Sequence, residues 1–164
     1  MNLATFNALP DEAAQAAVAH CVAIPHWQQA LVAARPFASP AALLAEAERL
    51  AQAWNRDDLD QALAAHPRIG ERARGAEKEA ALSRREQSAM ADADAALQQA
   101  MLAGNRAYEA RFGRLFLIRA SGRSGDEMLA QLQRRLENDA ETETREALAQ
   151  LREITLLRLK EILT

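Results

Sequence analysis

Residues 39–54 read SPAALLAEAERLAQAW, a pattern typical of an amphipathic helix. Ser39 suits the N-cap position, and Pro40 suits the first helical position, where a backbone N–H has no intrahelical partner. The apolar residues that follow recur at spacings of three and four, which matches one face of a helix: Leu43, Leu44, Ala47, Leu50, Ala51 and Trp54. This segment therefore predicts a helix with one apolar face.

Prolines, glycines and capping residues divide the rest of the chain into segments that read almost entirely as helix. In the first part of the chain we expect helices from Pro10 to about Cys21 and from Pro25 to just before Pro36. A turn at Asn55–Asp58 is followed by a short helix that leads into His66. Later helices are expected from Ser83 to about Arg111, with Gly104-Asn105 as an irregularity, from Ser124 to about Asn138, and from about Ala140 onward. Leu115–Ile118 is the exception, and we expect it to be an extended, buried segment. The predicted fold class is all-α: a single-domain bundle of about seven or eight helices over residues 1–164.

The composition agrees with a globular helical protein and excludes several functions. The chain has 164 residues, of which 49% are hydrophobic and only 4% aromatic, a balance that favours helices over strands. A formal net charge of -3 provides no strong basic field for nucleic acid. Cys21 is the only cysteine, so neither an internal disulfide nor a thiolate zinc site can form.

The chain ends indicate a location. The N-terminal residues lack the charge and the long apolar run of a secretory signal. The last residues, Glu161-Ile162-Leu163-Thr164, differ from the Ser-Lys-Leu peroxisomal address. We therefore expect a cytoplasmic protein with no membrane contact.

The run His66-Pro67-Arg68-Ile69-Gly70 places a titratable imidazole against a residue that ends helices. His66 is expected just past the C-terminal end of the apolar run Leu59–Ala65. The negative end of a helix dipole favours an imidazolium there, so a proton donor can be built in this way. A plain helix stop has the same features. Residues 67–82 are expected to be a long ordered loop, a type that often serves function.

Ser83-Arg84-Arg85-Glu86-Gln87 has two interpretations. Ser83 at the N-cap and Glu86 three residues later form a capping box, which satisfies two backbone donors. Alternatively, the N–H groups at a helix start create an anion site beside Glu86 and Gln87. Both interpretations require a defined helix start.

Two further regions offer binding groups. In Ile118–Gly122, the glycine lets backbone approach a ligand closely, although a buried apolar rung followed by a turn has the same sequence. Arg123 can bind a carboxylate or lie on the surface. Arg158 lies among leucines, so it is either a side chain that reaches along apolar surface to solvent or a guanidinium directed into a pocket.

Other chemistries are absent from the sequence. No nucleophile elbow, phosphate-binding loop or dinucleotide glycine motif is present. His20 and His26 are not at a spacing that shares one helix face, so we expect ordinary core or surface histidines and no metal site. Trp27 and Trp54 lie in apolar stripes and are expected in the core.

An ordered set of motifs resembles the family of 2-oxo-4-hydroxy-4-carboxy-5-ureidoimidazoline (OHCU) decarboxylases of urate breakdown. The resemblance covers about residues 5–160. It rests on His66-Pro67-Arg68-Ile69-Gly70, Ser83-x-x-Glu86-Gln87, Tyr108-Glu109-x-x-Phe112-Gly113-x-x-Phe116-x-Ile118, Ala120-Ser121-Gly122-Arg123-Ser124 and Arg135-Leu136-x-Asn138-x-x-x-x-Glu143.

The resemblance implies a helical homodimer that converts OHCU to (S)-allantoin and carbon dioxide without a metal or organic cofactor. It implies His66 and Glu86 as the catalytic residues, a histidine and its acidic partner. We predict that His66 is the proton donor and that Glu86 orients His66 or the substrate. The implied substrate contacts are Pro67, Ser83, Arg84, Arg85, Glu86, Gln87, Ile118, Arg119, Ala120, Ser121, Gly122 and, by a looser match, Arg158. Two alternatives stay open at this point: a non-catalytic helical interaction module, and a related lyase or hydrolase acting on another ureido-heterocycle.

Overall fold

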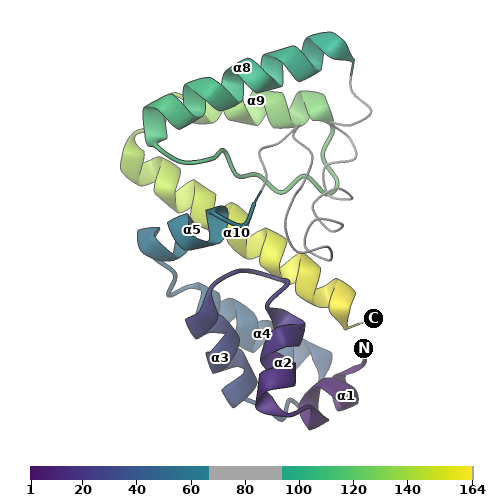
Figure 1. Cartoon of the computed structure of the whole chain (residues 1–164). Coiled ribbons are helices and arrows are strands. Elements are labelled where there is room, and N and C mark those ends of the chain that lie inside the picture. The colour runs from purple at the N-terminus through teal and green to yellow at the C-terminus, as the bar shows by residue number, and fades with distance from the viewer. Residues whose placement is uncertain (67–93, 164) are drawn as a thin grey trace. The chain divides into compact units, whose positions relative to one another are not determined.

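The computed structural model of the chain describes residues 1–66 and 94–163 (Figure 1). Within these ranges the chain forms eight helices and no strand, which confirms the predicted all-α fold class. No helix among these residues is both long enough and apolar enough to cross a membrane.

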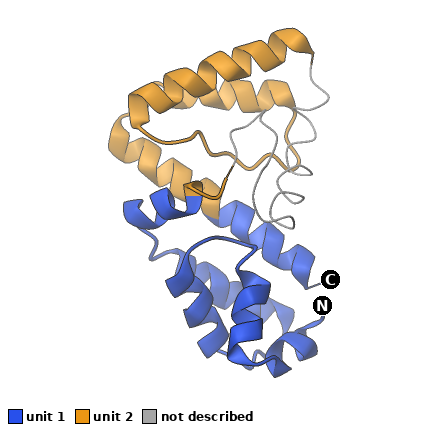
Figure 2. Cartoon of the chain, in the orientation of Figure 1, with its two compact units in different colours: residues 1–62, 152–164 blue, residues 63–151 orange. Residues whose placement is uncertain are grey.

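The chain forms two compact units (Figure 2). The first unit comprises Met1–Ala62 with Arg152–Thr164, and the second comprises Leu63–Leu151. The last helix, α10 (Ala140–Ile162), contributes its first part to the second unit and its last turns to the first unit. The expected single domain over residues 1–164 stays a prediction.

The first unit is built from short helices around an aromatic and aliphatic core. Its helices, besides the end of α10, are α1 (Leu3–Ala8), α2 (Asp11–Val18), α3 (Pro25–Ala33), α4 (Pro40–Ala51) and most of α5 (Arg56–Leu63). The Met1 amino group donates to the Ile162 carbonyl at 3.1 Å, so the N-terminus and the end of α10 lie together in this unit.

Helix α4 begins and packs as its sequence predicts. The Ser39 hydroxyl accepts the N–H of Ala42, and Pro40 occupies the first turn. Leu43, Ala47 and Ala51 are fully buried, which is the i, i+4, i+8 face of the stripe. Trp27 of α3 packs on this face, and its Nε1 donates to the Ala47 carbonyl at 3.1 Å. Trp27 and Trp54 are both core residues, as expected.

Two predicted boundaries in this unit differ from the structure. The predicted turn at Asn55–Asp58 is wrong, because α5 starts at Arg56. The N–H of Asp58 donates to Asn55 Oδ1, and the N–H of Asn55 donates to Asp58 Oδ2, both at 3.0 Å. This reciprocal cap lets polar residues begin a helix immediately. Helix α2 ends at Val18, before the predicted Cys21, whose N–H closes a turn on the Val18 carbonyl.

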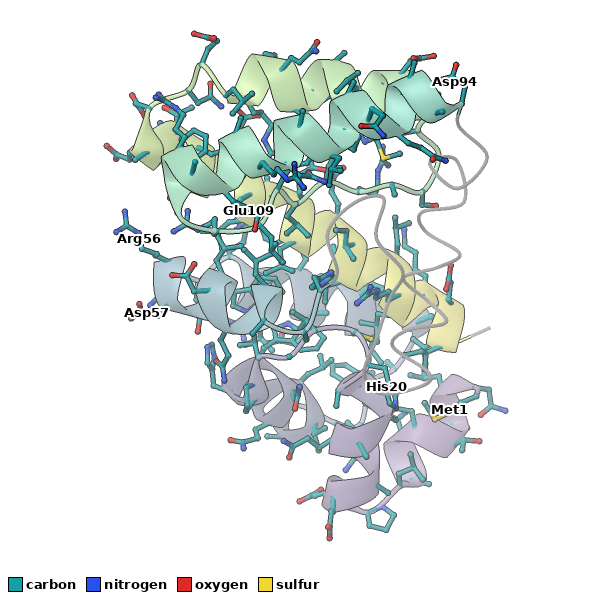
Figure 3. All side chains as sticks on the ribbon, turned by 45° about the horizontal axis from the view of Figure 1, so that its top comes forward. Met1, His20, Arg56, Asp57, Asp94 and Glu109 are labelled. Atoms are coloured by element: carbon teal, nitrogen blue, oxygen red, sulfur yellow. The ribbon has the colours of Figure 1, made fainter. Side chains whose placement is uncertain are left out.

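The second unit pairs α8 (Ala95–Phe112) with α9 (Gly125–Arg135), beside the first part of α10. The predicted continuous helix from Ser83 to about Arg111 is wrong, because Asp94 is extended (φ −69°, ψ 167°). The Asp94 carboxylate accepts the N–H of Leu97 and starts α8 there, while Glu109 lies in the last turns (Figure 3). Gly113, with φ 71°, ends the helix in the left-handed conformation.

Gly104 allows α8 and α9 to approach closely. The predicted irregularity at Gly104-Asn105 is wrong, since α8 continues through both residues. A Cβ atom on Gly104 would lie 2.4 Å from Cδ2 of Leu132 in α9, a distance that real side chains do not tolerate. Glycine therefore serves helix packing here, despite its poor helix propensity.

Candidate active site

His66 lies just past the C-terminal end of α5. The helix ends at Leu63, and the N–H of His66 donates to the Leu63 carbonyl at 3.0 Å, which closes a final turn. The side chain is half-buried. The predicted position of His66 after the apolar run is confirmed, and the dipole of α5 presents its negative end toward this residue.

Several predicted site residues lie outside the described part of the chain: Pro67, Ser83, Arg84, Arg85, Glu86 and Gln87, together with the expected loop at 67–82. The capping box and the anion site at Ser83–Gln87 both stay predictions. The pairing of His66 with Glu86 stays a prediction as well.

The segment after α8 is extended and buried, as predicted. Residues 115–120 have no helical structure, and Phe116, Leu117, Ile118 and Ala120 are buried. Phe116, Ile118 and Ala120 pack in one cluster of α8 and α9 side chains that includes Tyr108 and Met128. Every second residue of the segment thus enters the cluster, which is the side-chain period of two in an extended chain.

A tight turn follows at Ala120–Arg123. The N–H of Arg123 donates to the Ala120 carbonyl at 3.1 Å, and Gly122 has a φ of 80°. Glycine is favoured at the third position of such a turn because other residues are strained there. Ser121 and Gly122 are exposed, whereas Arg119 is half-buried. The turn therefore presents backbone at the surface of the unit.

The residues after the turn fix its position. Arg123 Nε donates to the Arg119 carbonyl at 2.8 Å, so part of its guanidinium is used inside the segment. The Ser124 hydroxyl accepts the N–H of Glu127 and starts α9, which confirms the predicted helix start at Ser124. Ile118–Gly122 is thus held between two helices, α8 before it and α9 after it.

Side chains from α9 and α10 bind the backbone of the segment. Arg135 Nη1 donates to the Leu117 carbonyl at 2.7 Å, and Gln150 Oε1 accepts the N–H of Arg119 at 2.8 Å. A buried extended chain needs such partners because it has no helical bonds of its own. These two contacts supply them on both sides of Ile118.

Arg135 belongs to a buried ionic network centred on Glu143, which is 0% exposed. Arg135 donates to both Glu143 oxygens, with Nε at 3.0 Å from Oε1 and Nη2 at 2.5 Å from Oε2. The Tyr108 hydroxyl and Asn138 Nδ2 also donate to Glu143. The guanidinium carbon lies 4.6 Å from the centroid of the Phe116 ring. Burial, followed by the Glu143 contact, raises the pKa of Tyr108 above its ordinary value, so this phenol stays protonated and donates.

Sequence reasoning assigned no role to this network or to Gln150, although the pattern contained a signal. Met128, Leu132 and Arg135 follow one another at helical spacing, and all three are buried in α9. A charged residue therefore occupies a core position of an amphipathic stripe, and buried charges are normally paired. The charged residues Arg135 and Glu143 could have been predicted as partners on this ground.

A second ion pair lies at the edge of the network. Arg134 donates to both oxygens of Glu146, at 3.1 and 2.6 Å, and Asn138 Nδ2 donates to Glu146 Oε2. The hydrogen bond from Arg134 lowers the pKa of Glu146, against the opposing effect of burial. A lowered folded-state pKa gives stability that is present above the unfolded pKa and is lost as the pH falls through the folded value.

We expect Glu146→Gln to lower the free energy of unfolding at pH 7 by no more than about 1 kcal/mol, since both partners are partly exposed. The difference from the wild type should shrink as the pH falls from the pKa of an unfolded glutamate through the lowered folded-state pKa of Glu146. Urea unfolding of both proteins at pH 7 and at pH 3 measures this effect. A difference that grows on acidification would contradict the assigned sign.

Arg158 lies in the first unit, near the end of α10, and is only 1% exposed. Its Nη1 donates to the Cys21 carbonyl at 3.4 Å. The interpretation of Arg158 as a side chain that reaches solvent is therefore wrong, because the whole guanidinium is enclosed. This hydrogen bond joins the turn after α2 to α10 within the first unit.

The other two histidines, His20 and His26, lie in the first unit, at a turn and in α3 respectively. His26 Nε2 lies 2.7 Å from Asp58 Oδ1, and its side chain is 58% exposed. His20 lies in the turn after α2 (Figure 3). Within the described ranges, no three His, Cys, Asp or Glu side chains come together as metal ligands. The absence of a metal or organic cofactor stays a prediction.

Comparison with known proteins gives concordant matches. The family model described as OHCU decarboxylase matches residues 7–160. A crystal structure of OHCU decarboxylase in the presence of (S)-allantoin has a TM-score of 0.77 and 27% identity, and the match covers 94% of this chain and 99% of that one. A crystal structure of (S)-allantoin synthase has a TM-score of 0.75 and 17% identity, and shows the fold alone. That match covers 100% of this chain and 54% of the (S)-allantoin synthase chain. Among curated protein sequences, none matches.

These matches define an all-α enzyme of the carboxy-lyase class. The chain belongs to the OHCU decarboxylase family, which acts in urate degradation.

Proposed function

We propose that the chain catalyses the decarboxylation of OHCU to (S)-allantoin, with His66 as the proton donor. The observation that carries the proposal is the family match over residues 7–160, which includes the His66 motif. The position of His66 past the end of α5 supports the role, since a helix C-terminus favours the protonated imidazole that a donor requires.

The reaction needs little from the protein besides geometry and one proton. When the bond to the carboxylate breaks, its electron pair moves toward the adjacent C=N of the imidazoline and carbon dioxide leaves. The former C=N nitrogen takes up a proton, and the ureido-bearing carbon takes up a second one. The hydroxyl-bearing carbon loses its hydroxyl proton and becomes a carbonyl, so the net uptake is one proton. Delivery of the proton to one face of the ureido-bearing carbon determines the handedness of allantoin. A positioned acid typically contributes about 10²–10⁴-fold to such a step.

The remaining proposed roles concern binding. Glu86 orients His66 or the substrate, and Pro67, Ser83, Arg84, Arg85 and Gln87 line the site. Backbone and side chains of Ile118, Arg119, Ala120, Ser121 and Gly122 contact the heterocycle. The extended segment and the turn at Gly122 support this role, because exposed backbone can pair with a polar ring.

Arg158 is the proposed partner of the substrate carboxylate. The family match supports this choice, because it extends to residue 160 and so includes Arg158. Arg123 is the alternative partner, and its Nε is bonded to the Arg119 carbonyl. We further propose that the enzyme is a cytoplasmic homodimer and uses no metal or organic cofactor.

Circular dichroism of freshly generated OHCU, with and without the protein, tests the function. OHCU also decays spontaneously to racemic allantoin, so both rate and optical activity must be followed. The proposal predicts faster decay and a single-handed (S) product. An unchanged decay curve would instead indicate a different ureido-heterocycle as the substrate.

A further inference from the structure

We propose that Arg135 and Gln150 are positioning residues that hold the backbone around Ile118 in its binding geometry. The inference rests on the proposed function for the role of Ile118–Gly122 in substrate binding. Neither side chain needs to touch the substrate. Each acts through a hydrogen bond to the backbone of the segment.

The two contacts anchor consecutive peptide groups. The Leu117 carbonyl belongs to the peptide group before Ile118, and the Arg119 N–H belongs to the peptide group after it. Arg135 holds the first at 2.7 Å, and Gln150 holds the second at 2.8 Å. Because the two backbone dihedrals of Ile118 connect these groups, anchoring both peptide planes fixes its conformation.

The anchors are themselves rigidly supported. Arg135 is 2% exposed, and its guanidinium is bonded to both oxygens of Glu143 and stacked near the Phe116 ring. Gln150 is half-buried on α10, the helix that also carries Glu143. The two bonds therefore reach the segment from two different helices, α9 and α10. Packing of Ile118 in the apolar cluster holds its side chain but leaves the direction of its peptide groups unspecified.

This arrangement has a consequence for catalysis. A displacement of about 1 Å in a positioning element can reduce the rate by about 10²-fold, because reacting groups must be held near their attack geometry. Loss of the Gln150 anchor should therefore raise KM and lower kcat, with little effect on global stability, because Gln150 is outside the buried Arg135–Glu143 pair. This pattern separates positioning from a purely structural role.

Gln150→Leu tests the inference, with Gln133→Leu as the matched control on the exposed surface of α9. We expect kcat/KM for OHCU to fall about tenfold or more in Gln150→Leu. Amide hydrogen exchange across residues 115–123 should become faster in that variant, while the melting temperature stays near that of the control. Gln150→Glu retains an oxygen acceptor for the Arg119 N–H and should restore slow exchange and most of the activity.

The outcomes are distinct. Unchanged amide exchange in Gln150→Leu, or faster exchange with an unchanged kcat/KM, would overturn the positioning role. If the wild-type protein failed to accelerate OHCU decay, the proposed function would fail instead. The exchange measurement would still decide whether Gln150 anchors the segment, because it requires no turnover.

Discussion

His66→Asn is expected to abolish the stereospecific formation of (S)-allantoin while the protein stays folded. Asparagine keeps the backbone N–H that closes the last turn on Leu63, but it has no group that can donate a proton near neutral pH. The loss should amount to about 10²–10⁴-fold in the catalysed rate, the usual contribution of a positioned acid. The product should approach the racemate of spontaneous decay. Circular dichroism, followed as OHCU decays, measures both the rate and the optical activity of the product.

The matched control is His26→Asn, which replaces an exposed histidine in the first unit. This variant should retain wild-type activity, and its loss of the Asp58 contact should alter stability only slightly. Glu86→Ala should resemble His66→Asn in activity, because Glu86 is proposed to orient the donor. Formation of (S)-allantoin at the wild-type rate by His66→Asn would falsify the assignment of the proton donor.

Arg135→Met should destabilise the second unit by about 3–5 kcal/mol, because removal of one partner leaves a charge buried without compensation. Glu143 is 0% exposed and would lose all of its bonds from Arg135, while the Leu117 carbonyl would lose its donor. Urea unfolding, followed by far-UV circular dichroism, measures the change. The double variant Arg135→Met with Glu143→Gln should recover part of the loss, since it removes the unpaired charge as well.

Arg134→Met provides the comparison within the same helix. Arg134 is adjacent to Arg135 but lies at the surface, where its pair with Glu146 is partly exposed. Its replacement should change the free energy of unfolding by about 0–1 kcal/mol. Similar losses in Arg134→Met and Arg135→Met would show that burial does not determine the energy of the network.

Local rules predicted much of the fold. The Ser39-Pro40 start and the apolar stripe of α4 were predictable because both depend on residues within a few positions of each other. The cap at Ser124 and the extended segment after Gly113 were predictable for the same reason. In each case the deciding feature is local: a side-chain hydroxyl that caps a nearby backbone N–H, or the spacing of apolar side chains within the element.

The wrong boundaries arose where two local signals competed. Asn55–Asp58 has the composition of a turn, yet its side chains cap the start of α5 reciprocally. Asp94 lies within a long alanine-rich run that favours helix, yet its extended backbone and its carboxylate cap start α8 at Ala95. Propensity summed over a window does not register a single capping residue of this kind.

The helical fold class, the family and the position of His66 after a helix all follow from local patterns and motifs in the amino-acid sequence. What holds the candidate binding segment follows instead from long-range contacts. Arg135 and the Leu117 carbonyl are 18 residues apart, and Gln150 and the Arg119 N–H are 31 apart. No periodicity or cap connects residues at such separations, because their contact depends on how α9 and α10 pack beside the segment. The need for glycine at position 104 also follows from a long-range contact, because the Leu132 side chain of α9 occupies the space that a Cβ atom would take.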